Sequence, residues 1–341
     1  MKRTLWIPIL TSLLLVFGTA VAQDQPGEGV TVQPAVATWQ SALPIEAIFA
    51  QLLGELGYDV ADAQSVSNPI FYQAVTQGDV DYWANGWFPL HNAQLPDNFE
   101  ETAEVVGTII ENGALQGYLV DRASAEKYDI TSLEDFKRPE VKEAFDANGD
   151  GKADLVACPP GWGCEQVISH HMNVYDLGDH VNAITASYAA SFADALARYR
   201  NGEPILYYTW TPNFTVVQLV PGEDVVWINV PETVPSEAQQ GLEDAMVASG
   251  VTGAVTDPLR FGFVANDIKT VANSEFLAAN PAAAALFEAV KIPLDDISEM
   301  TRRISEGESG DDDIAAMATE WIENNREAVD GWLEQARSAA M

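Results

Sequence analysis

Positive charge is scarce in this sequence. Its 341 residues include 17 lysines and arginines against 51 aspartates and glutamates, for a formal net charge of −34. Nucleic acid and anionic membrane surfaces repel such a chain, so neither is expected as a partner. The acidic residues are spread over the whole length. This spread indicates a solvated acidic surface suited to a saline habitat. It is less typical of a surface that attracts cationic substrates to one site.

Long apolar runs are scarce as well. The run from Leu5 to Phe17 is too short for a comfortable membrane span. It follows Lys2 and Arg3 and precedes Ala20-Val21-Ala22, which has the small-x-small form of a signal-peptidase site. We therefore expect residues 1–22 to be a cleaved signal peptide. No cysteine follows the apolar run to carry a lipid, so the predicted location is the periplasm, without a lipid anchor.

Familiar enzyme motifs are missing. The sequence has no Gly-x-Ser-x-Gly elbow, no phosphate-binding loop and no paired-cysteine redox motif. No nucleophile and base can be nominated as a pair, so we do not expect an enzyme. His170, His171 and His180 lack a further ligand at metal spacing, which argues against zinc.

Cysteine occurs twice, as Cys158 and Cys164 at the ends of Cys-Pro-Pro-Gly-Trp-Gly-Cys. An exported protein permits a disulfide, and two cysteines allow one intramolecular pairing. If joined, they close a rigid loop, because proline fixes φ while glycine adopts angles closed to other residues. The loop would present Trp162 outward beside the N–H groups of Gly163 and Cys164. This arrangement of an indole and two backbone donors suits a ligand with a soft cation and a carboxylate. The alternative is a purely structural disulfide without a binding role.

The periodic segments predict an α/β protein. Val30–Val32 is expected to form a strand, Leu43–Leu56 has the apolar spacing of a helix, and Tyr58–Val60 begins another strand. This order is typical of a largely parallel sheet flanked by helices. The length is sufficient for two domains with ordinary cores.

Later segments predict where the ligand and the domain crossings lie. Asp79–Asn85 is expected to be a buried strand with Trp87 and His91 beyond its carboxyl end, where open α/β sheets bind ligands. Two strands are expected around Asn112-Gly113, leading to the first crossing between domains. Val225–Ile228 is the expected return strand.

Three tryptophans, Trp87, Trp162 and Trp210, each lie in a loop or at a strand end beside glycine or proline. A quaternary ammonium group donates no hydrogen bond, so a protein must hold it by cation–π and dispersion contacts, about 2 kcal/mol per desolvated ring. A cage of such rings, with its dispersion contacts, would bring micromolar affinity, about 8 kcal/mol, within reach. For the other tryptophans outside the leader we expect core packing: Trp39, Trp83, Trp227, Trp321 and Trp332.

His91 has two readings from its position alone. As a neutral imidazole it would donate to a ligand carboxylate. As a loop histidine it would be satisfied by the protein itself.

The stretch from Asp146 to Asp154 matches the first positions of a calcium-binding loop. The candidate ligands are Asp146, Asn148, Asp150, Lys152 and Asp154. The bidentate glutamate expected three residues later is absent, since Ala157 stands there. A structural calcium ion is one hypothesis and a tight Asx-type turn without metal is the other. No cofactor is otherwise expected.

Four stretches carry a family resemblance that runs through nearly the whole mature chain: Asn85–His91, Asn148–Leu155, Cys158–Glu165 and Tyr207–Pro212. The chain resembles the ProX-type glycine betaine/proline betaine-binding proteins of ProU-type ABC importers, a family of periplasmic solute-binding proteins. The resemblance implies a two-lobed, type II-like α/β fold in which each lobe has a mostly parallel sheet flanked by helices and the ligand lies in the cleft. We expect lobe 1 to comprise residues 23–120 and 229–341, and lobe 2 residues 121–228.

The resemblance also implies roles for particular residues. The family boxes a trimethylammonium group with three tryptophans, at the positions of Trp87, Trp162 and Trp210. A histidine and two backbone N–H groups bind the ligand carboxylate, at the positions of His91, Gly163 and Cys164. The family's disulfide falls on Cys158 and Cys164.

The expected function is capture of a small zwitterionic quaternary ammonium osmolyte by a monomer that closes its lobes and delivers the ligand to an ABC permease and its ATPase. Either Pro159 or Pro160, together with Phe88 and Asn213, departs from the family pattern near the tryptophans. These departures leave the ranking of betaines, choline and sulfonium analogues open. A receptor for choline or another quaternary ammonium or sulfonium compound is the main alternative. A secreted enzyme acting on a betaine-like substrate and a non-transport sensor subunit are the others.

Overall fold

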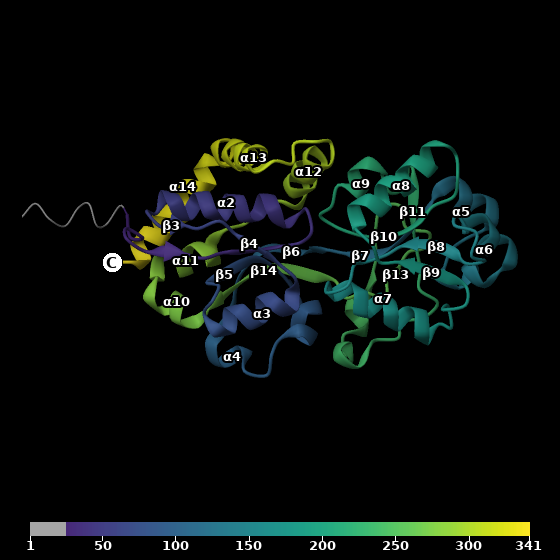
Figure 1. Ribbon diagram of the computed structural model, residues 1–341, viewed down its shortest axis with the longest axis horizontal. Helices are drawn as coiled ribbons and strands as arrows, with labels where there is room; N and C mark the ends of the chain where they lie inside the picture. Colours follow the sequence, from purple (N-terminus) through teal and green to yellow (C-terminus); the bar gives the residue numbers. More distant parts are fainter. Residues whose placement is uncertain (1–24) are drawn as a thin grey trace, which may run out of the picture.

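Two groups of strands joined by crossings of the chain form the two lobes of the molecule (Figure 1). The computed structural model describes residues 25–341, and the predicted signal peptide lies outside them. The chain builds part of the first lobe, crosses to build the second and returns to complete the first. Within residues 25–341, no helix is both long and apolar enough to cross a membrane.

The first lobe is made by both ends of the described chain. Its amino-terminal part comprises β1 (Thr31–Val32), β2 (Ala35–Ala37), α2 (Ala42–Glu55), β3 (Asp59–Val60), β4 (Gln64–Val66), α3 (Asn68–Gln77), β5 (Tyr82–Phe88), η1 (Leu90–Gln94), α4 (Phe99–Thr102) and β6 (Ala103–Ala114). Its carboxyl-terminal part comprises β14 (Asn266–Asn273), α10 (Ser274–Ala279), α11 (Pro281–Ala289), α12 (Leu294–Ser305), α13 (Asp311–Asn324) and α14 (Arg326–Ala339).

The second lobe holds the elements between the crossings. They are β7 (Gln116–Asp121), α5 (Arg122–Tyr128), η2 (Leu133–Lys137), α6 (Pro139–Phe145), β8 (Ala153–Val156), α7 (Gly163–Val174), β9 (Val181–Ile184), α8 (Tyr188–Arg200), β10 (Leu206–Trp210), α9 (Thr215–Gln218), β11 (Val225–Ile228), η3 (Glu237–Gln239), η4 (Glu243–Met246), β12 (Val247–Ala248) and β13 (Leu259–Arg260).

Local sequence explains the main helices of the first lobe. The predicted helix at Leu43–Leu56 is α2, and it buries Ile45, Ile48, Phe49, Leu52 and Leu53, which share one face at helical spacing. Helix α3 ends at Gly78, whose left-handed conformation (φ 75°) suits a residue without a Cβ. Helix α11 begins at Pro281, where the missing N–H has no intrahelical partner to lose.

The sheets are mixed, whereas the sequence predicted mostly parallel ones. In the first lobe, β14 lies between β5 and β6 and runs antiparallel to both. In the second lobe, the order is β11-β7-β10-β8-β9, with parallel pairing on the β8 side and antiparallel pairing of β7 with β10 and β11. The antiparallel strands carry the chain into or out of a lobe. The parallel pairs are joined through crossover helices, as α7 joins β8 to β9.

Two strands flank the first crossing, as predicted, but the break between them is not at Asn112-Gly113. Both residues lie within β6, and Leu115 alone separates β6 from β7 in the other lobe. Leu115 donates its N–H to the hydroxyl of Thr211 at 3.1 Å, and Thr211 returns its N–H to the carbonyl of Leu115 at 2.9 Å. The crossing is therefore tied to the residue that follows Trp210.

The second crossing comes later than the predicted boundary at residues 228 and 229. Val230 donates its N–H to the carbonyl of Arg260, and Trp227 forms a bridge with Ala254, so the segment after β11 stays on the second lobe. The chain leaves at Ala265, directly before β14. The boundary was misplaced because the segment between β11 and β14, which includes the short strands β12 and β13, carries no local signal of the lobe on which it packs.

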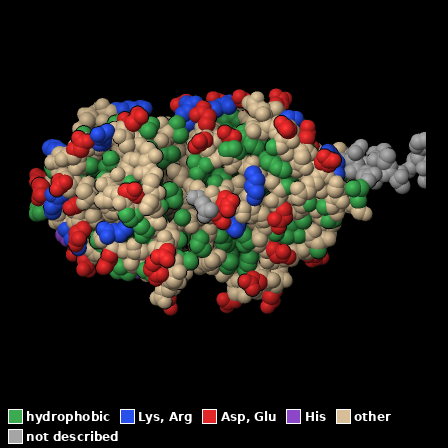
Figure 2. Space-filling view, turned by 180° about the vertical axis from the view of Figure 1, so that it is seen from behind, with side chains coloured by type: hydrophobic (Ala, Val, Ile, Leu, Met, Phe, Trp, Pro, Cys, Tyr) green, Lys and Arg blue, Asp and Glu red, His purple; other side chains and the backbone are tan. Residues whose placement is uncertain are grey.

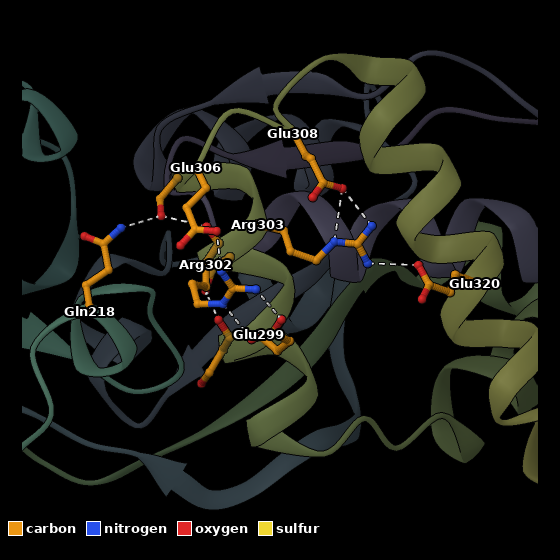
Figure 3. Close-up of polar contacts among 10 residues, drawn as sticks. Gln218, Glu299, Arg302, Arg303, Glu306, Glu308 and Glu320 are labelled. Carbon is orange, nitrogen blue, oxygen red and sulfur yellow. Dashed lines mark hydrogen bonds and ion pairs between the residues drawn. The ribbon is translucent and has the colours of Figure 1, made fainter.

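Charge is distributed over both lobes. Figure 2 shows Asp and Glu side chains across the whole visible face, with fewer Lys and Arg side chains among them. Several of the basic side chains are held by the acidic ones: Arg303, near the end of α12, contacts Glu308 at 2.7 Å and Glu320 of α13 at 2.9 Å (Figure 3). Residues 306–310, between α12 and α13, thus form an exposed loop that Glu308 ties to α12.

Candidate functional site

A cavity of about 30 Å³ lies between the lobes. The six residues that the sequence predicts to contact a ligand all line it: Trp87, His91, Trp162, Gly163, Cys164 and Trp210. Four further residues complete the wall: Trp39, Leu90, Gln116 and Tyr208. The first lobe contributes through Trp39, which lies between β2 and α2, and through β5 and η1. The second lobe contributes through the cysteine loop, the start of α7, β7 and β10.

The aromatic walls stand nearly perpendicular to one another. The ring of Trp162 lies 5.5 Å from that of Trp39 at an interplanar angle of 74°, and 5.4 Å from that of Trp210 at 87°. Tyr208 packs on Trp210 with ring centroids 5.9 Å apart. Edge-to-face packing is a favourable arrangement of aromatic pairs, so the walls support one another and enclose the cavity from several sides.

Two of the indoles share a hydrogen-bond acceptor. Trp39 and Trp87 both donate their Nε1–H to Asn85 Oδ1, at 2.8 Å and 3.0 Å. Asn85 and Trp87 are two residues apart on β5, so their side chains lie on the same face of the strand. With both donors occupied, these indoles have only carbon and π surface left for a ligand.

The other two indoles donate across the cleft. Trp162 Nε1–H donates to Thr38 Oγ1 of the first lobe at 2.7 Å, and Trp210 Nε1–H reaches Ser41 Oγ at a longer 3.5 Å. The indole N–H groups of the second lobe thus find their acceptors in the first lobe. The structure has the two lobes closed on each other, so these hydrogen bonds form only in the closed form.

The predicted disulfide between Cys158 and Cys164 is present. Within its loop Gly161 has φ 89°, and a Cβ there would lie 3.3 Å from the side chain of Ser67 in the first lobe. Glycine meets both requirements, the left-handed backbone and the close approach of the lobes. The loop ends where α7 begins, at Gly163.

The start of α7 supplies donors for an anion. The first N–H groups of a helix have no intrahelical acceptor, and the helix dipole places partial positive charge there. Gly163 and Cys164 occupy this first turn and line the cavity. A carboxylate in the cavity would meet two backbone donors and a favourable field.

His91 is buried in the wall and uncharged. Burial lowers the pKa of the imidazole to about 3. Its Nδ1 accepts the N–H of Trp87 at 3.2 Å and lies 2.7 Å from the hydroxyl of Tyr72, while Nε2 lies 3.0 Å from Asn68 Nδ2. Both ring nitrogens therefore already contact protein groups. The role of donor to a ligand carboxylate stays a prediction.

The calcium hypothesis is not supported. Among residues 25–341 no three His, Cys, Asp or Glu side chains are grouped to hold a metal ion. Asp146 instead accepts three backbone N–H groups of its own loop, at 2.7 to 3.0 Å, and Asp154 accepts two more, both at 3.0 Å. Asp150 accepts the N–H of Lys152, whose ammonium donates to a backbone carbonyl, and Asn148 donates to Asp154. The stretch is the Asx-type turn that was the alternative.

Sequence analysis missed four wall residues: Trp39, Leu90, Gln116 and Tyr208. Trp39 was expected in the core, yet it lines the cavity from the segment between β2 and α2. Its neighbours Thr38 and Gln40 are neither glycine nor proline, so the rule that found Trp87, Trp162 and Trp210 does not select it. Gln116 and Tyr208 have no comparable signal, because only the pairing of β7 with β10 brings them together.

This chain is similar in sequence to proteins of known function. Residues 30–324 match the family described as the substrate binding domain of ABC-type glycine betaine transport systems. The chain is 37% identical over 340 residues to the glycine betaine-binding periplasmic protein OusX of Dickeya dadantii, covering 100% of both chains. It is 36% identical over 326 residues to the glycine betaine/proline betaine-binding periplasmic protein of Salmonella typhimurium, covering 95% of this chain and 96% of that one.

The fold has solved counterparts. The crystal structure of a glycine betaine, L-proline ABC transporter binding protein from Borrelia burgdorferi superposes with a TM-score of 0.68 at 17% identity, covering 91% of this chain and 100% of that one. At this identity the likeness concerns the fold alone. It agrees with the two-lobed architecture predicted from the sequence.

Proposed function

The chain belongs to the family of substrate-binding domains of ABC-type glycine betaine transport systems, and from that membership we propose that it captures glycine betaine or a close relative between its lobes for an ABC permease. Its curated relatives are periplasmic binding proteins. We accordingly place this protein in the periplasm, as a carrier that makes and breaks no bond.

The observation that carries the proposal is the wall of four indoles whose N–H groups are all donated to protein acceptors. A fully methylated ammonium group offers no hydrogen for a polar partner, so it loses little on entering such a wall. Each desolvated ring stabilises the cation by about 2 kcal/mol. A primary ammonium would leave its own donors unpaired among ring carbons, at a cost in free energy. The wall therefore favours an onium head group.

In this proposal the carboxylate end of the ligand lies at the start of α7. The N–H groups of Gly163 and Cys164 would bind the carboxylate, aided by the helix dipole. His91 lies beside them: a Cβ added at Gly163 would be 3.3 Å from His91 Cδ2. A site for a cation at one end and for a carboxylate at the other matches the two charges of a betaine.

Closure of the lobes completes the site. The cavity wall is divided between the lobes, and the indoles of Trp162 and Trp210 donate to Thr38 and Ser41 in the closed form. A ligand that contacts both halves of the wall stabilises this form relative to an open one. We propose that a permease with its ATPase recognises the closed, loaded form.

The test is titration of the mature protein with glycine betaine, proline betaine and choline, followed by calorimetry and tryptophan fluorescence. We expect saturable binding of a betaine at micromolar or lower concentration, with weaker binding of choline. Trp162→Ala should weaken betaine binding about 30-fold, the equivalent of one lost ring. Trp332→Ala, which removes a tryptophan of α14 outside the wall, is the control. Absence of binding to every betaine would overturn the proposal.

A further inference from the structure

Gln116 is a polar side chain in an otherwise aromatic wall. It is the first residue of β7, directly after the crossing at Leu115, and only 2% of its surface is exposed. It pairs with Trp210 across the two strands. Directly opposed residues lie on the same face of a sheet, so the amide of Gln116 lies beside the indole of Trp210 and borders the same cavity.

The orientation of the amide is set by Tyr208. The hydroxyl of Tyr208 donates to Gln116 Oε1 at 2.6 Å. Burial raises the pKa of this hydroxyl, so it keeps its proton and remains a donor. With the oxygen held in this way, the NH₂ group of the amide is directed elsewhere.

That NH₂ group has no hydrogen-bond partner anywhere in residues 25–341, although it is buried. A buried donor without an acceptor is costly, and native structures seldom keep one without a reason. Here the donor belongs to a residue that lines the ligand cavity. An acceptor on the ligand would remove the cost.

We propose that Gln116 Nε2 donates a hydrogen bond to the acceptor end of the bound ligand, and that Gln116 thereby selects carboxylate-bearing onium compounds over those that end in a hydroxyl. This assignment rests on the proposed function and extends it by one specificity-determining residue. The partial positive charge on the amide N–H groups repels a cation. Gln116 Nε2 therefore does not bind the onium group, which in this proposal contacts the indoles. A carboxylate accepts more strongly than a hydroxyl because the bond is charge-assisted.

The experiment compares glycine betaine with choline in three proteins besides the wild type. Gln116→Glu keeps the shape and an acceptor for Tyr208 but replaces the donor with a negative charge. Gln116→Leu removes the donor without adding charge. Gln239→Glu is the matched control: Gln239 is also buried, its Nε2 also lacks a partner among the described residues, and it lies outside the cavity wall.

We expect Gln116→Glu to weaken glycine betaine binding by about 10- to 100-fold, the range for a hydrogen bond to a charged group. Choline binding should change by less than about 3-fold, because its hydroxyl can donate to the new carboxylate. Gln116→Leu should lower the ratio of betaine to choline affinity in the same direction, and Gln239→Glu should leave that ratio as in the wild type. Thermal unfolding of each variant identifies any that fail to fold.

Two failures are distinguishable. A wild-type protein that binds no betaine overturns the proposed function. A wild type that binds betaine, with an unchanged betaine-to-choline ratio in the folded Gln116 variants, overturns the Gln116 assignment alone. Should neither variant fold, a crystal structure of the betaine complex decides: a ligand with no atom within hydrogen-bonding distance of Gln116 Nε2 rejects the assignment.

Discussion

Asn85 shows how one buried side chain sets two walls of a binding cavity. Its Oδ1 accepts from both Trp39 and Trp87, and the side chain is only 2% exposed. An indole has two rotatable side-chain bonds, and a hydrogen bond at its nitrogen restricts both. Trp39 and Trp87 are therefore positioned together, and Trp39 in turn meets Trp162 of the second lobe.

Trp39 should matter for the onium end of any ligand. We expect Trp39→Ala to weaken glycine betaine and choline about equally, each by about 30-fold, since both carry a trimethylammonium group and each ring contributes about 2 kcal/mol. Trp39→Phe should lose less, because a ring face remains. Calorimetric titration measures both affinities. If Trp39→Ala bound both ligands with wild-type affinity, Trp39 would contribute only to packing of the protein and not to ligand binding.

Buried neutral histidines make the stability depend on pH. Burial lowers the pKa of His171 to about 3, from 6.5 in the unfolded chain. The unfolded state therefore binds a proton between these values while the folded state does not, so this contribution is complete above pH 6.5 and is lost as the pH falls. Between pH 7 and pH 5 the loss amounts to about 2 kcal/mol.

A variant isolates this contribution. His171 lies outside the cavity wall, 2.9 Å from the hydroxyl of Tyr118 and 3.1 Å from the carbonyl of Gly262. The free energy of unfolding should decrease between pH 7 and pH 5 in both proteins. In His171→Gln this decrease should be about 2 kcal/mol smaller than in the wild type. Denaturant titration at the two pH values measures it. The same pH dependence in variant and wild type would contradict the assignment.

At the scale of elements, the lobes also touch outside the cavity. Figure 3 shows Gln218 of α9 directed toward the end of α12, where its amide donates to Ser305 Oγ at 2.9 Å. Ser305 in turn donates to the carbonyl of Arg302, whose guanidinium is paired with Glu299 and Glu306. The second lobe thus closes onto a helix end that is already held in place.

Removing this contact should weaken closure without changing selectivity. Gln218→Ala is expected to lower the affinity for betaine and for choline by the same factor, up to about 10-fold, since one neutral hydrogen bond contributes about 0.5–1.5 kcal/mol. Gln51→Ala is the control, because Gln51 of α2 donates to Ala315 within the first lobe. Calorimetry with both ligands reports the result. A change in the betaine-to-choline ratio would mean that Gln218 acts on the site itself.

At the scale of the whole molecule, a net charge of −34 favours unfolding through self-repulsion. Salt screens this repulsion, with a Debye length of about 30 Å at 0.01 M and about 3 Å at 1 M. We expect the thermal midpoint to rise between these sodium chloride concentrations. Betaine affinity should change by less than about 3-fold, because a zwitterion carries no net charge. A midpoint that falls with salt would show that surface ion pairs such as Arg303–Glu308 outweigh the repulsion.

Much of this could be read from the sequence because its signals are local. Helical spacing at Leu43–Leu56, the proline at the start of α11 and the pairing of two cysteines each depend on neighbouring residues. The same holds for Trp87, Trp162 and Trp210, whose glycine and proline neighbours placed them at strand and loop ends. The features that were wrong or absent depend on distant pairing. The crossing at Leu115, the mixed sheets and the late return at Ala265 follow from which strands meet.

The sequence by itself determined the α/β class, the disulfide and six residues that line one cavity, because local composition and motif spacing carry that information. Tertiary structure alone decided that Trp39 joins the wall, that the indoles of the second lobe donate to Thr38 and Ser41, and that Gln116 has an unpartnered donor beside Trp210. Each of these depends on contacts between segments far apart in the chain. Such contacts exist only once the strands have paired and the lobes have closed.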